Sequence, residues 1–178
     1  MKKFIALVVC CCCAAVFAGD KEVKDIINKT QLGAKAPRGW TLYKLNKNVG
    51  TGVIVQGTEK DEKALKISAP NGVTYFFSLA SHKVKAGDKV KISADVRGKG
   101  TFYVGCYSYD QKNKYLSVPG LMKSFTLLGV EREIEIEFVV ANGKKGEITE
   151  AVRPVIGAGK GSELLIEDLE IEIDYKDR

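Results

Sequence analysis

Short runs in which apolar and polar residues alternate are the feature that most limits the fold of this chain. Between residues 131 and 140, apolar side chains alternate with charged ones: Ile134, Ile136 and Phe138 against Glu133, Glu135 and Glu137. Successive side chains of a strand point to opposite faces of a sheet, so a period of two predicts a half-buried strand. Helical periodicity is weak throughout, and turns that contain glycine separate the runs. The pattern therefore predicts an all-β sandwich or barrel.

The runs are numerous enough for two packed sheets. We expect strands over residues 23–28 (or a helical turn there), 40–45, 52–57, 63–69, 73–79, 89–97, 101–109, 122–128, 131–140, 151–156 and 164–175. In the last run the alternating apolar residues change from even-numbered to odd-numbered positions after Ile166, which predicts a bulge or kink near Glu167 and Asp168. The outward glutamates are expected to form solvated faces.

A tight hairpin is expected where Gly98-Lys99-Gly100 separates two of these runs. If Arg97 lies opposite Thr101, one face of the pair is apolar and the other is polar and aromatic, whereas a one-residue slip would mix them. The apolar face holds Ile92, Ala94, Val96, Phe102, Val104 and Cys106, and the other holds Lys89, Lys91, Ser93, Asp95, Tyr103, Gly105, Tyr107 and Tyr109. Cys106 is therefore expected in the core, as a small buried hydrophobe.

Residues 1–18 have the three parts of a secretory signal peptide. Lys2 and Lys3 form a basic start, an apolar and cysteine run covers residues 4–17, and Val16 and Ala18 stand at the −3 and −1 positions before Gly19. The run is shorter than the roughly 20 apolar residues of a membrane-spanning helix. We expect residues 1–18 to be removed and residues 19–178 to form a single exported domain (periplasmic, cell-surface or extracellular) without a transmembrane segment. A retained anchor or a buried helix is the alternative.

Cysteines bear on both anchoring and folding. Residues 10–13 are all cysteine, which raises lipid attachment as a further alternative, but Val9 rather than a small residue precedes Cys10. Removal of residues 1–18 leaves Cys106 alone, so the domain has no internal disulfide and depends on its core. The same removal leaves 26 basic residues against 22 acidic ones, a net charge of +4. The basic residues are spread out and no nucleic-acid motif accompanies them, so we expect no nucleic-acid partner.

A series of loose motifs runs over residues 36–174. In order, they are Pro37-Arg38-Gly39-Trp40, Ala64-Leu65-Lys66-Ile67, the stretch 84–98, Tyr107-Ser108-Tyr109-Asp110, Lys114-Tyr115-Leu116 and Ile166-Glu167-Asp168-Leu169. This series resembles the carbohydrate-binding modules of the family 4/9 type, which are galactose-binding-like jelly rolls. The resemblance implies a two-sheet antiparallel β-sandwich (jelly roll) that binds polysaccharide, although such folds host many roles.

Two departures from that family are visible. Its members often open with an Asn-Gly-x-Phe-Glu-like segment whose glutamate helps to hold a structural calcium. Here Asn28-Lys29-Thr30-Gln31 stands in that region without an acidic residue, and Gly129-Val130 stands where the family often has a tryptophan. We therefore expect no cofactor and no metal, with a structural calcium on a degraded motif as the alternative.

Tyrosines form the candidate ligand site. Tyr103, Tyr107 and Tyr109 share one face of the expected hairpin, and residues two apart on a strand are separated by about 6.6 Å. Flat rings at such a spacing can lie under sugar rings, with a hydroxyl at the edge for hydrogen bonds. The alternative is that these tyrosines only cover the surface of a sheet.

Further residues are expected to complete this site. Asp95 and Arg97 would flank the tyrosines across the hairpin and bond to sugar hydroxyls. Tyr115 follows the loop 110–114 and would border the same face. Trp40, the only tryptophan, is a candidate contact, with packing in the core as the alternative.

Catalysis finds little support in the sequence. His82 is the only histidine, and Cys106 is the only cysteine left after removal of residues 1–18, so neither has a second residue of its kind for a metal site. No nucleophile–base motif occurs. We therefore expect a secreted, non-catalytic polysaccharide-binding module and not an enzyme. One alternative is a cell-envelope structural or protein-interaction domain on the same fold, with an envelope protein as its partner. A hydrolase that uses a pair of glutamates is a weaker one.

Overall fold

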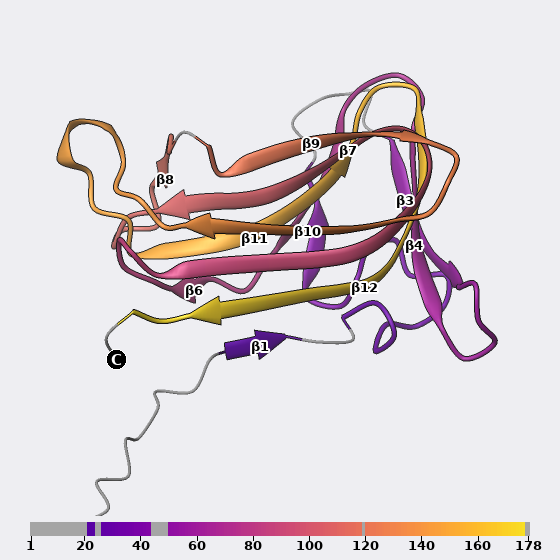
Figure 1. Ribbon diagram of the computed structural model, residues 1–178, viewed down its shortest axis with the longest axis horizontal. Helices are drawn as coiled ribbons and strands as arrows, with labels where there is room; N and C mark the ends of the chain where they lie inside the picture. The colour runs from indigo at the N-terminus through magenta and orange to yellow at the C-terminus, as the bar shows by residue number, and fades with distance from the viewer. Residues whose placement is uncertain (1–20, 24–25, 44–49, 119, 177–178) are drawn as a thin grey trace, which may run out of the picture.

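The computed structural model describes residues 21–23, 26–43, 50–118 and 120–176, so the expected signal peptide lies outside the described residues. Strands make up nearly all of the regular structure, which confirms the all-β prediction. They are β1 (Lys21–Val23), β2 (Trp40–Leu42), β3 (Thr51–Gln56), β4 (Lys63–Ala69), β5 (Thr74–Ser78), β6 (His82–Lys83), β7 (Lys89–Tyr109), β8 (Tyr115–Leu116), β9 (Met122–Leu128), β10 (Arg132–Val139), β11 (Ala151–Ala158) and β12 (Ser162–Asp174), with one 3-10 turn, η1 (Lys144–Gly146) (Figure 1). Within the described part, no helix has the length and apolar character needed to cross a membrane.

The strands form an antiparallel β-sandwich in which β7 belongs to both layers. Its first half pairs with β10 and β12, and its second half pairs with β8, β9 and β11. In Figure 1 the ribbon of β7 turns back on itself at the right of the view, so the two halves lie in different layers. The layer with β10, β12, β4 and β3 is called the charged sheet below. The layer with β2, β5, β11, β8 and β9 is called the tyrosine sheet.

The predicted hairpin at Gly98-Lys99-Gly100 is wrong, because these residues form a corner between the two sheets. The halves of β7 do not pair with each other, and β7 continues through the glycines as one strand of 21 residues. Gly98 and Gly100 have φ angles of 129° and 115°. A Cβ on Gly98 would lie 2.1 Å from the carbonyl oxygen of Glu163 on β12. The glycines therefore allow β12 to cross the bend at close range, and the strand changes sheet where a hairpin would have stayed in one.

The division of β7 into an inner and an outer face is as predicted, although the register is not. Ile92, Ala94 and Val96 of the first half are buried in the same core as Phe102, Val104 and Cys106 of the second. Alternation dictates which side chains face inward whether a strand pairs with its neighbour or crosses to the other sheet. Burial raises the pKa of the Cys106 thiol to about 12, so this cysteine is a core residue with negligible thiolate at neutral pH.

The bulge predicted in the last strand is confirmed. The pairing of β12 with β7 shifts register between Glu167 and Glu170, and Asp168 has a φ of 46°. Glu167 lies at the shift and is buried, and its carboxylate accepts hydrogen bonds from the backbone N–H (2.8 Å) and the hydroxyl of Thr58. The shift also keeps apolar side chains buried on both sides of the bulge, from Leu164 to Ile173.

Candidate functional site

Six of the seven tyrosines of the chain gather on the outer side of the tyrosine sheet. They come from four segments and are called the tyrosine face: Tyr43, Tyr75, Tyr103, Tyr107, Tyr109 and Tyr115. Ring centroids are 5.6 Å apart for Tyr75 and Tyr103 and 5.7 Å apart for Tyr107 and Tyr115. Edge-to-face and tilted contacts at such distances are favourable for aromatic rings. The tyrosines therefore support one another as a continuous aromatic surface.

A glycine on the strand between them allows two of these rings to meet. Gly157 of β11 lies opposite Tyr75 of β5 on one side and opposite Tyr103 of β7 on the other. A Cβ at this position would lie 2.4 Å from Cδ1 of Tyr75. The missing side chain thus leaves room for the rings to close over β11.

Four members of the tyrosine face line an open hollow of about 290 Å³. Tyr43 and Tyr115 are 37% and 55% exposed, whereas Tyr107 and Tyr109 are half-buried at its wall. Burial, with the neighbouring tyrosines, raises the pKa of Tyr107 to about 12. Its hydroxyl therefore stays protonated at neutral pH and remains a hydrogen-bond donor.

A cation borders the same surface. Arg153 of β11 lies opposite Tyr107 in the ladder, and its Cζ atom is 4.8 Å from the ring centroid of Tyr109. This is within the range of a cation–π contact. Burial raises the pKa of Tyr109, and the charge of Arg153 lowers it.

A second, more polar cleft of about 370 Å³ adjoins the hollow. It is lined by Ser81, Lys83, Asp110, Gln111, Asn113, Glu150 and Ala151. The two cavities are neighbours because Asp110 follows Tyr109 directly and Ala151 pairs with Tyr109 across β11 and β7. The aromatic hollow therefore has a polar cleft beside it.

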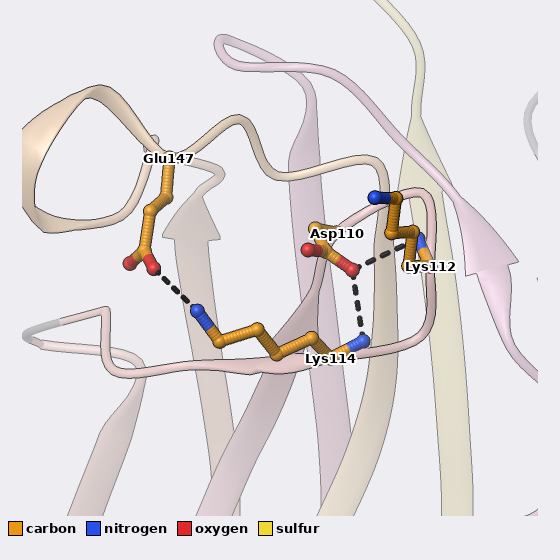
Figure 2. Close-up of polar contacts among 4 residues, drawn as sticks. All are labelled: Asp110, Lys112, Lys114 and Glu147. Atoms are coloured by element: carbon orange, nitrogen blue, oxygen red, sulfur yellow. Dashed lines mark hydrogen bonds and ion pairs between the residues drawn. The ribbon is translucent and has the colours of Figure 1, made fainter.

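The turn between Tyr109 and Tyr115 is held by its own polar contacts (Figure 2). Oδ1 of Asp110 accepts hydrogen bonds from the backbone N–H groups of Lys112 (2.9 Å) and Lys114 (2.8 Å). Nζ of Lys114 is 3.0 Å from Oε1 of Glu147, which joins the turn to the loop after β10. These contacts position Tyr115 over the hollow.

The structure brings together some of the predicted site residues and separates others. Tyr103, Tyr107, Tyr109 and Tyr115 lie on the tyrosine face, as described above. Asp95 and Arg97 belong to the first half of β7, where Asp95 lies opposite Glu133 of β10 and Glu167 of β12. The expectation that they flank the tyrosines is therefore wrong, because the corner carries them to the charged sheet.

Trp40 lies away from the hollow as well. Its side chain is only 7% exposed and packs in the core, so the packing alternative describes its place in the structure.

Sequence reasoning did not find Tyr43, Tyr75 and Arg153. The alternation in residues 73–79 placed Tyr75 on one face of a strand, but no local signal tells which strand lies beside which. The link depends on the order β2-β5-β11-β7, in which strands distant in the sequence are neighbours.

The segment linked to calcium by family resemblance uses its oxygen atoms for another purpose. Nζ of Lys63 donates hydrogen bonds to the carbonyl oxygens of Asn28 and Thr30, each at 2.7 Å. Oδ1 of Asn28 accepts a hydrogen bond from the backbone N–H of Lys63 (2.8 Å). Among the described residues, no group of three or more acidic, histidine or cysteine side chains is arranged to hold a metal. Because the ammonium group of Lys63 is hydrogen-bonded to these carbonyl oxygens, the residues present do not fit a calcium site.

Comparisons with known proteins bear on the fold. No protein-family model matches the sequence, and no curated protein matches it. A cyclase from Fischerella sp. TAU has a TM-score of 0.61 at 10% identity, over 89% of this chain and 100% of the cyclase. The family 11 carbohydrate-binding module of the cellulase Lic26A-Cel5E of Clostridium thermocellum has a TM-score of 0.51 at 14% identity, over 86% and 94%.

The enzymatically active domain of tailspike protein 4 of bacteriophage CBA120 has a TM-score of 0.58 at 11% identity, and the match covers 75% of this chain and 19% of the tailspike. This chain thus spans about a fifth of that protein. At such identities the likeness concerns the fold alone, and the proteins that share it include both enzymes and binding modules. The chain has the β-sandwich fold found in carbohydrate-binding modules.

Proposed function

We propose that this chain is an exported, non-catalytic module that binds polysaccharide on the tyrosine face, a galactose-binding-like jelly roll of the family 4/9 kind. The observation that carries the proposal is the open hollow lined by Tyr43, Tyr107, Tyr109 and Tyr115. The fold shared with a family 11 carbohydrate-binding module supports it. The signal-peptide pattern of residues 1–18 supports export.

The chemistry of the hollow suits a sugar ring. Tyrosine rings offer flat apolar surfaces for the C–H groups of a pyranose, and their hydroxyls offer hydrogen bonds at the edge. The hollow, at about 290 Å³, is near the lower end of ligand pockets, which measure about 300–1,000 Å³. A single sugar unit would fill it, and neighbouring units of a chain would run toward the polar cleft at Asp110 and Glu150.

Catalysis is not part of the proposal. The four residues that line the hollow are tyrosines, and two carboxylates, those of Asp110 and Glu150, line the neighbouring cleft. One of these, Asp110, already accepts two backbone hydrogen bonds. Prolonged incubation with the polysaccharides that bind should release no reducing ends.

Affinity gel electrophoresis against a panel of soluble polysaccharides tests the proposal, with a glycan microarray to survey short oligosaccharides. We expect retardation by at least one polymer and none in a gel without polysaccharide. Failure to bind any member of both panels would contradict the proposal. A stoichiometric protein captured from the envelope fraction would then favour the protein-interaction alternative.

We also propose that Lys63 stabilises the segment 28–31, the region in which carbohydrate-binding modules of the family 4/9 type often hold a structural calcium. Replacing Lys63 with methionine keeps most of the side chain but leaves the carbonyl oxygens of Asn28 and Thr30 without their charged donor. The loss of hydrogen bonds from a charged group should lower the free energy of unfolding by about 2 kcal/mol. Thermal unfolding of this variant should show a melting temperature about 4–8 °C lower.

The matched control is Lys66→Met on the same strand, where the lysine is exposed. This control should change the melting temperature little. Addition of calcium or of EDTA to the unaltered protein should leave the melting temperature unchanged. A clear rise with calcium would contradict the proposal, because it would require a metal site that competes with the ammonium group.

A further inference from the structure

We propose that the tyrosine face selects acidic polysaccharides, and that Arg153 binds the carboxylate of a uronic acid unit. This inference rests on the proposed function and names the class of glycan. β11 holds Arg153 directly beside the second half of β7. The guanidinium lies over the ring of Tyr109, one of the residues that line the hollow.

The guanidinium group has unused hydrogen-bonding capacity. Its Nε atom is buried and has no hydrogen-bond partner within the described part of the protein. The ion pairs found there join Lys89 to Glu137, Lys91 to Glu135 and Lys114 to Glu147, and none of them involves Arg153. A buried donor without an acceptor is costly, and native proteins seldom keep one without a reason. A ligand acceptor that met this donor, after a small movement of the side chain toward the hollow, would remove this cost.

Geometry selects the kind of acceptor. The planar guanidinium fork matches a carboxylate with two parallel N–H···O bonds, which a sugar hydroxyl does not offer. Contact with the ring of Tyr109 limits the freedom of the guanidinium group, so less freedom is lost when a ligand binds. A uronic acid unit carries its carboxylate on the ring that would stack against the tyrosines, so one sugar unit can use both features.

The other charges at this end of the sandwich divide into engaged and open groups. The carboxylates of Asp110 and Glu147 already accept hydrogen bonds from the 110–114 turn. Lys83 and the exposed Glu150 line the adjoining cleft. Among the charged groups at this end, Arg153 is the one whose charge lies over a tyrosine ring of the hollow, so it is the positive charge that an approaching anionic chain meets there.

A matched pair of polymers separates this inference from the proposed function. The probes are a soluble polyuronate and the same polymer after chemical reduction of its carboxyl groups to alcohols. The full chain should bind the polyuronate at least about tenfold more tightly, as expected for a charge-assisted bidentate contact. Arg153→Gln should remove this preference and leave binding of the reduced polymer nearly unchanged.

Two variants keep the result interpretable. Arg153→Lys retains the charge but loses the fork, and should lose most of the preference. Lys66→Gln removes one positive charge from the charged sheet, and should keep the preference. Near-ultraviolet circular dichroism checks that the aromatic side chains as a whole keep their environment in each variant.

Each outcome has a defined meaning. Equal binding of both polymers would overturn the inference and leave the proposed function standing. Binding of neither polymer, together with no retardation in the wider panel, would overturn both. An anionic preference that Arg153→Gln and Lys66→Gln weaken equally would overturn the inference too, because net charge would then explain it.

Discussion

Replacing Tyr107 and Tyr109 together with alanine is expected to abolish measurable polysaccharide binding. Both rings line the hollow, and Tyr115 packs edge-on against each of them, at 5.7 and 6.2 Å. The double variant therefore removes two stacking surfaces and the support of a third. Aromatic residues at the centre of a binding site commonly contribute 2 kcal/mol or more each, so affinity should fall by at least about 30-fold per ring. Isothermal titration calorimetry with the polysaccharide that retards the protein most in the affinity gel measures this loss.

The control for this experiment keeps the rings. Tyr107→Phe with Tyr109→Phe leaves the stacking surfaces and the contacts with Tyr115 but removes two hydroxyl groups. We expect a loss of about tenfold, because each net hydrogen bond is worth about 0.5–1.5 kcal/mol. Unchanged binding by a folded alanine double variant would show that the tyrosine face is not the ligand site, even if the protein binds glycans.

Alternation along the chain was sufficient to predict most of the strands. The predicted ranges 63–69 and 122–128 match β4 and β9 residue for residue, and the bulge in β12 falls where the apolar phase shifts. The short strands β6 and β8 were missed, since two residues are too few to show a period. The alternation indicates which side of a sheet each residue faces, and the faces predicted in this way are correct along the whole of β7.

The neighbours of each strand in the sheets were harder to predict, because strand pairing depends on residues far away in the sequence. Gly98-Lys99-Gly100 has the local character of a hairpin loop, and the faces of the strands on either side would be the same in a hairpin and in a corner. The difference arises from the close passage of β12 at Glu163. As a result, the predicted site contained Asp95 and Arg97, which lie in the charged sheet, and lacked Tyr75 and Arg153.

The corner itself leads to the other large predicted effect, which is on stability. Gly98→Ala should lower the free energy of unfolding by about 3 kcal/mol or more. The φ of 129° is a conformation that only glycine adopts readily, which costs other residues about 1–3 kcal/mol. The new Cβ would also overlap the backbone oxygen of Glu163, and this oxygen cannot move aside as a flexible side chain would. The melting temperature should fall by about 10 °C in a thermal scan.

Gly161→Ala separates the two causes. Gly161 also has a positive φ, 79°, but no atom lies within 4 Å of the Cβ position. This variant should lose only about 1–2 kcal/mol, the cost of the left-handed conformation. If residues 98–100 formed an exposed hairpin turn, the two variants would be equally stable, and that result would contradict the corner.

The corner and β8 lie at opposite ends of the sandwich (Figure 1). Gly98→Ala should therefore bind polysaccharide normally at temperatures where it is folded, because the glycine is required for the passage between the sheets and not for the surface that the tyrosines form.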